Sequence, residues 1–70
     1  MNEEEFIKFV GANIKKTRIE KGIKQIDLAI KIGIEDSSLR RIESGRTNPT
    51  LKTIFKIAEA LEISLNVLWT

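Results

Sequence analysis

Apolar residues recur at helical spacing along the whole chain, and no segment shows the alternation of a strand. The first stretch carries Phe6, Val10 and Ile14 at i, i+4 and i+8 and runs to about Lys21. Asn2 precedes this stretch as an N-cap, with Glu5 as its capping-box partner, and Gly22 follows it. The pattern predicts a first helix with a well-defined start.

Two shorter helices are predicted in the middle of the chain, from about Gln25 to Ile32 and from about Asp36 to Ser44. Gly33 stands where the first of them must stop within one residue, a place that favours a positive φ, and Gly45 closes the second. Residues on one face of the first helix, Gln25, Leu28, Ala29 and Ile32, are followed on the second helix by Leu39 and Ile42, which continue that face. The spacing predicts two helices joined by a tight turn.

The remaining residues predict a fourth helix and a short fifth one. Pro49 keeps Asn48 out of a helix, and Thr50 then caps the fourth helix. Its evenly spaced apolar residues are Leu51, Ile54, Phe55, Ala58 and Leu61. Ser64 is expected to cap the last helix, with Ile63 packing onto Leu68. We therefore expect an all-α, compact five-helix domain over residues 1–70.

Composition excludes several classes of function. The 70 residues contain no Cys and no His, so a disulfide or a Cys/His metal site cannot form. No apolar run approaches 18 residues, and the N-terminus, MNEEE, is unlike a signal peptide. Without His, Cys, Tyr or a Gly-rich phosphate loop, an enzyme is not expected. We expect a cytoplasmic protein with no cofactor, no membrane contact and no evident small-molecule ligand.

The net charge of +2 conceals an uneven distribution. All twelve Lys and Arg fall between Lys8 and Lys56, where five acids leave a balance of +7. The remaining acids lie at the two ends of the chain. A basic centre fits a surface that faces nucleic acid, although a solvated surface of mixed charge fits the same counts.

The ordered set of residues from Arg18 to Leu61 resembles the lambda-repressor/Cro-type (XRE-like) helix-turn-helix family. The residues that carry the resemblance are Arg18, Gly22, Gln25, Leu28-Ala29, Ile32-Gly33-Ile34, Leu39, Ile42-Glu43, Gly45, Asn48-Pro49-Thr50-Leu51, Ile57-Ala58 and Ala60-Leu61. The small size is similar to that of restriction–modification controller proteins and of short phage or plasmid repressors. The resemblance places a helix-turn-helix at about residues 25–45.

The resemblance makes the third predicted helix the one that reads DNA bases. Carried over by position, the base-contacting residues are Asp36, Ser37, Arg40 and Arg41. A helical wheel independently turns Ser37, Arg40 and Arg41 outward when Leu39 and Ile42 face the core. An arginine can donate two hydrogen bonds to guanine, whereas solvated surface arginines would need no partner.

The resemblance also implies phosphate contacts and one ion pair. Gln25 matches the position that grips a phosphate at the start of the second helix, and Arg46, Asn48 and Lys52 surround the start of the fourth. Arg18 and Glu43 match a pair that ties the first helix to the end of the third, which gives Arg18 a structural role.

Three features depart from the family pattern. Lys24 stands where a Ser or Thr cap is usual, and it could add a phosphate contact instead. Glu35 and Asp36 open the third helix, where phosphates would repel them, and N-capping by Asp36 is the expected main role. Ile26 and Ile30 lie on a side that is usually polar; we expect them to extend the core rather than to form an exposed strip.

The C-terminal segment, about residues 63–70, has more apolar side chains than a short helix can bury. Leu65, Val67, Leu68 and Trp69 are therefore expected to pair with a second copy of the chain, although Trp69 could instead close the domain's own core. We expect a homodimeric regulator that reads a palindrome in double-stranded DNA and covers a promoter or contacts RNA polymerase. The alternative is a protein-interaction module of the same fold, such as an antitoxin or anti-repressor subunit.

Overall fold

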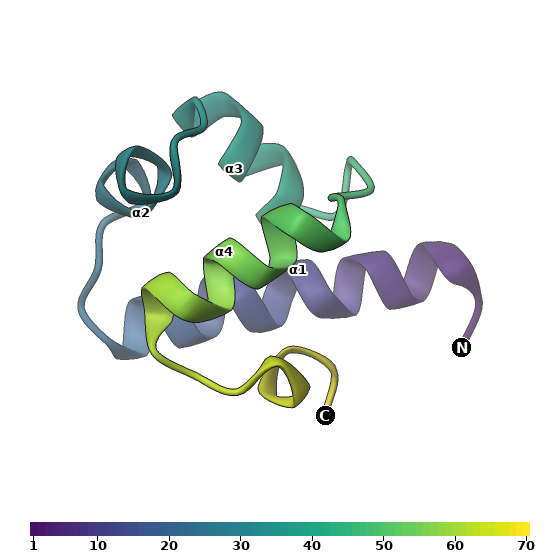
Figure 1. The fold of residues 1–70 in the computed structure, drawn as a ribbon. Helices are drawn as coiled ribbons and strands as arrows, with labels where there is room; N and C mark the ends of the chain where they lie inside the picture. Colours follow the sequence, from purple (N-terminus) through teal and green to yellow (C-terminus); the bar gives the residue numbers. More distant parts are fainter.

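The computed structural model describes all residues from Met1 to Thr70 and contains only helices and turns. Four α-helices, α1 (Glu3–Glu20), α2 (Gln25–Ile32), α3 (Asp36–Glu43) and α4 (Leu51–Leu61), are followed by a 3₁₀ turn, η1 (Leu65–Trp69). The prediction of an all-helical fold is confirmed, but the fifth helix is only this turn. In Figure 1, α1 and α4 lie one behind the other, α2 and α3 stand above them, and η1 lies below.

The start of α1 has the predicted capping box. The Asn2 side chain accepts a hydrogen bond from the backbone N–H of Glu5 at 2.9 Å, and the Glu5 carboxylate accepts one from the N–H of Asn2 at 3.1 Å. Val10 and Ile14 are buried as expected, whereas Phe6 stays exposed because α1 extends beyond the elements that cover it.

The turn between α2 and α3 follows from Gly33. This residue has φ +78°, and the N–H of Ile34 donates to the carbonyl of Ala29, so the last carbonyls of α2 are satisfied as the chain reverses. The apolar residues of the two helices lie in one core: Leu28, Ala29, Ile32, Leu39 and Ile42 are all buried. The predicted helix–turn–helix is therefore confirmed.

Helix α4 begins at the predicted cap, since the Thr50 hydroxyl accepts the N–H of Thr53 at 3.1 Å. Its buried side is rotated from the expected one. Leu51 is 85% exposed and Phe55 55% exposed, while Ile57 and Ala60 are buried. The reason is that α2 packs along the Ala60 side of α4, which leaves the opposite flank of the apolar face uncovered.

The C-terminal turn packs back onto the domain. Leu68 is completely buried, and the Asn13 side chain donates to its carbonyl at 2.9 Å, which ties η1 to α1. The prediction that Leu68 contributes to a dimer interface is therefore wrong, because the core of the same chain encloses it. Ser64 precedes η1 but makes no side-chain cap. None of the helices is long and apolar enough to cross a membrane.

Candidate nucleic-acid interface

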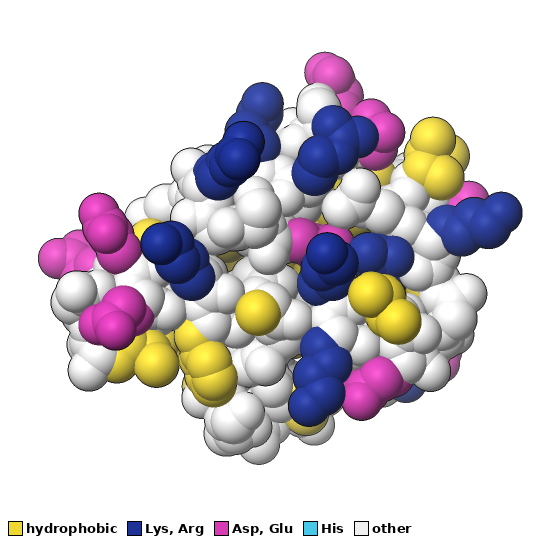
Figure 2. Space-filling model, turned by 180° about the vertical axis from the view of Figure 1, so that it is seen from behind, with side chains coloured by type: hydrophobic (Ala, Val, Ile, Leu, Met, Phe, Trp, Pro, Cys, Tyr) yellow, Lys and Arg dark blue, Asp and Glu magenta, His cyan; other side chains and the backbone are white.

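The outer side of α3 forms a polar depression. Its volume is about 400 Å³ and no apolar residue lines it. The lining residues are Ser37, Arg40, Arg41, Ser44 and Arg46, a group that we call the α3 depression. Seen from the α1 side, Lys and Arg side chains lie along the upper edge of the molecule together with Asp and Glu side chains, and α3 lies along this edge (Figure 2). The structure thus brings together three of the four residues predicted to contact bases.

Asp36, the fourth of these residues, is not a lining residue of the depression. Its carboxylate lies 3.4 Å from the Arg40 guanidinium, one helical turn away. The prediction that Asp36 caps α3 is wrong: Glu35 holds the N-cap position, without a side-chain hydrogen bond, and Asp36 is the first helical residue. Because Arg40 already faces a carboxylate, Arg41 is the arginine of α3 with no acidic partner.

The residues predicted to contact phosphates lie at two helix starts. Lys24 is the N-cap of α2 and makes no side-chain cap, as its residue type predicts, so the first N–H groups of that helix remain available to an anion. Arg46 and Asn48 lie in the turn before α4, and Lys52 is the second residue of α4. Arg46 and Lys52 have no acidic partner.

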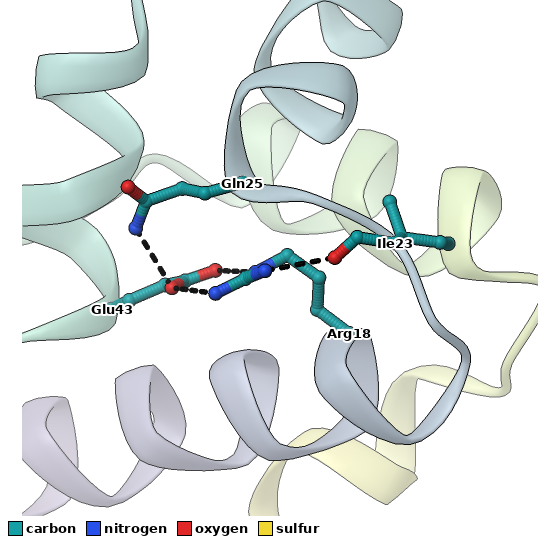
Figure 3. A network of polar contacts seen from close by, with 4 residues as sticks. All are labelled: Arg18, Ile23, Gln25 and Glu43. Carbon is teal, nitrogen blue, oxygen red and sulfur yellow. Dashed lines mark hydrogen bonds and ion pairs between the residues drawn. The ribbon is translucent and has the colours of Figure 1, made fainter.

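A buried network joins α1, the loop after it, α2 and the end of α3 (Figure 3). Arg18 donates to both carboxylate oxygens of Glu43, from Nε at 2.7 Å and from Nη2 at 3.0 Å, and from Nη1 to the Ile23 carbonyl at 2.8 Å. The two side chains of the pair are only 9% and 2% exposed. The ion pair expected from the resemblance is present, and it fixes α1 against α3.

Gln25 belongs to the same network. Its side-chain amide donates to Glu43 at 3.0 Å, so the Arg18–Glu43 pair sets the position of the α2 N-terminus. Gln25 was predicted to grip a phosphate. In the structure its amide nitrogen is engaged inside the protein, and the backbone N–H of the helix start is the group left for an anion.

Lys8 also lies beside this surface, which the sequence did not indicate. It lines a second hollow together with Gly45, Arg46, Thr47 and Asn48, although 37 positions separate it from Gly45. No local motif marks Lys8, because only the packing of α1 against the turn after α3 brings it there.

Two apolar regions remain uncovered. Ile26 is 51% exposed and Ile30 71% exposed on α2, so the expectation that they extend the core is wrong: the core lies on the opposite side of this helix. A narrow apolar groove of about 140 Å³ lies between α1 and the start of α4. Its rim includes the exposed side chains of Phe6, Leu51 and Trp69.

The chain is similar in sequence to known helix-turn-helix proteins. The helix-turn-helix family model matches residues 14–68. The chain is similar to an uncharacterized HTH-type transcriptional regulator, y4dJ, of Sinorhizobium fredii, with 39% identity over 57 residues that cover 81% of this chain and 74% of that protein. It is also similar to the ImmF control region 10 kDa protein of Bacillus phage phi105, with 43% identity over 61 residues that cover 87% and 68%.

Among solved structures, the restriction–modification controller protein C.AhdI from Aeromonas hydrophila has a TM-score of 0.91 and 29% identity. The superposition covers 97% of this chain and 99% of that one. The matched family region contains α2, α3 and α4 but leaves out residues 1–13.

Proposed function

Since the chain belongs to the helix-turn-helix family, we propose that it is a transcriptional regulator that binds a specific sequence in double-stranded DNA as a homodimer on a palindromic operator. The observation that carries this proposal is the α3 depression, which only serine and arginine residues line, on and just after the helix that follows the turn. A helix of this kind fits the major groove, where arginine and serine side chains reach base edges. Asp36 is proposed as a further contact through its place at the start of α3.

Phosphate contacts on both sides of α3 would fix the position of the protein on the duplex. We assign these to the α2 start, with Lys24 and Gln25, and to the α4 start, with Arg46, Asn48 and Lys52. Such contacts carry no sequence information but supply much of the affinity and its dependence on salt. In this arrangement the Arg18–Glu43 pair holds α1 against α3 and, through Gln25, positions the start of α2.

Selection of bound duplexes from a random pool tests the proposal. The expected result is an enriched palindrome whose half-sites lie about one helical turn, roughly 34 Å, apart. Titration of the selected duplex at two salt concentrations should show binding that weakens steeply with salt. Absence of binding even at low salt would instead favour the alternative, a protein-interaction module, for which the exposed Ile26 and Ile30 offer a contact surface.

Arg41→Ala and Arg46→Ala are expected to have different effects. Loss of a two-bond contact with guanine should cost about 1–3 kcal/mol and relax the preference at one or two base pairs. Loss of Arg46 should weaken binding to all sequences about equally. It should also reduce the salt slope, the steepness with which log K falls against log[salt], by about 0.9 per bound protomer. Affinities for the selected duplex and for single-base variants of it, measured across salt, distinguish the two. Equal behaviour of both variants would contradict this division of roles.

The dimer is proposed to form through the uncovered apolar groove and the adjoining C-terminal segment. Leu65, Val67 and Trp69 remain candidates there, and Phe6 and Leu51 join them in place of the buried Leu68. Exposed apolar surface of this kind marks interaction sites. A two-fold dimer would explain how so small a domain could read a palindrome.

Leu51→Glu is expected to convert the dimer to a monomer while leaving the fold intact, because this side chain is 85% exposed and an acid at a helix start is tolerated. Sedimentation equilibrium measures the mass. Ile30→Glu is the matched control, since Ile30 is similarly exposed but lies on α2. Dissociation by Ile30→Glu alone would place the interface on α2.

A further inference from the structure

A second polar hollow adjoins the α3 depression. Its volume is about 450 Å³, and Arg46 lines both. The other lining residues are Glu4, Ile7, Lys8, Gly45, Thr47 and Asn48; we call this region the α1 hollow. It extends the polar surface from α3, past the turn before α4, onto the N-terminal half of α1.

Lys8 is held in this hollow by its backbone and stem. Gly45 has φ +75°, and a Cβ at that residue would lie 2.8 Å from the Cα of Lys8 and 3.1 Å from its Cβ. The missing side chain at Gly45 therefore lets α1 lie directly against the turn. The Lys8 residue is nonetheless exposed, and its ammonium has no acidic partner.

The chemistry of the α1 hollow suits one kind of ligand. Lys8 and Arg46 provide two cations, and Thr47 and Asn48 provide a hydroxyl and an amide that can donate hydrogen bonds. Glu4 is the only acid among the lining residues and forms no ion pair. Lys and Arg side chains commonly bind DNA phosphates. Two unpaired cations beside the turn after α3 therefore suit the phosphates of a DNA strand next to the major groove that α3 would occupy.

We propose that Lys8 binds a backbone phosphate next to the one held by Arg46, so that the DNA contact extends onto α1. This inference rests on the proposed function. Lys8 lies outside residues 14–68, the part of the chain that the family model matches. Glu4, in the same hollow, opposes the contact by repelling the phosphate.

The test measures binding of the full chain to a short duplex that carries the selected site, across a range of salt. Lys8→Met keeps the stem that packs on Gly45 and removes the charge. Its salt slope should fall by about 0.9 per bound protomer. Its affinity deficit should therefore shrink about 3.5-fold per bound protomer, or about 12-fold for a dimer, between 50 and 200 mM salt. Lys8→Arg keeps the cation and should retain the native slope.

Two further variants separate a local contact from a change in total charge. Lys16→Met removes the same charge from an exposed residue about 12 Å further along α1, outside the hollow, and should leave the slope unchanged. Glu4→Gln should tighten binding, because it removes the one carboxylate near the phosphate. Thermal melting of each variant checks that the fold is intact.

The outcomes distinguish this inference from the function on which it rests. A native slope for Lys8→Met, or equal losses for Lys8→Met and Lys16→Met, would overturn the phosphate contact while leaving DNA binding in place. Failure of the native protein to bind any duplex at low salt would overturn the proposed function and the contact together.

Discussion

Arg18→Ala is expected to destabilise the protein by about 3–5 kcal/mol, because it leaves the buried Glu43 carboxylate without its cation. Glu43 is 2% exposed at its side chain, so water cannot take the place of the guanidinium. A domain of this length has a total stability of only about 4–10 kcal/mol, so the loss removes a large part of it. Urea unfolding followed by circular dichroism measures the effect, and the melting temperature should fall by more than about 12 °C.

The exposed pair on α3 supplies the control. Arg40→Ala removes the partner of Asp36, but both side chains are about half exposed or more, and such pairs contribute at most about 1 kcal/mol. Replacing both members of the buried pair, as Arg18→Met with Glu43→Leu, should recover much of the lost stability, because no charge is then left buried. If Arg18→Ala and Arg40→Ala cost the same, the buried pair is not the brace between α1 and α3.

Gly11→Ala is expected to destabilise the protein, although alanine is ordinarily the better helix residue by about 1 kcal/mol. A Cβ at Gly11 would overlap the Ile42 carbonyl oxygen and lie 3.0 Å from that of Glu43. These are backbone atoms at the end of α3 and cannot turn aside as a side chain would. Overpacking of this kind costs about 1–3 kcal/mol, occasionally more, and urea unfolding measures it.

The next residue, Ala12, allows the reverse substitution, from alanine to glycine, as a control. Ala12 is exposed on the same helix, so Ala12→Gly should cost about 1 kcal/mol through helix propensity alone. The pair of variants therefore separates intrinsic propensity from the close approach of two helices. If Gly11→Ala is as stable as the native protein or more stable, α1 does not press on α3 as the structure shows.

The close approach at Gly11 shows which part of the packing the local sequence predicts and which part it does not. A glycine inside a helix that has ordinary caps suggests a close neighbour, but the neighbour itself, the end of α3, lies more than thirty residues away. The same holds for Arg18: a resemblance can suggest its partner, whereas the engagement of Gln25 by that partner is visible only in the folded chain.

The starts of α1 and α4 and the end of α2 follow from the sequence alone. Asn2 with Glu5, Gly33, and Thr50 act through hydrogen bonds and backbone angles within a few residues, so their effect does not depend on the rest of the fold. The apolar spacing similarly predicts the shared core of α2 and α3. The helix-turn-helix between residues 25 and 45 can therefore be predicted from the local sequence.

The tertiary structure decides which side of each helix is covered. Ile26, Ile30, Leu51 and Phe55 have the same apolar character as the core residues, yet they stay exposed because no element packs over them. Leu68 is buried because η1 folds back onto α1 and α4. The packing of α1 against the Gly45 turn brings Lys8 beside Arg46. Burial depends on where distant elements come to lie; the periodicity of a single helix marks its apolar residues but does not show which of them another element will cover.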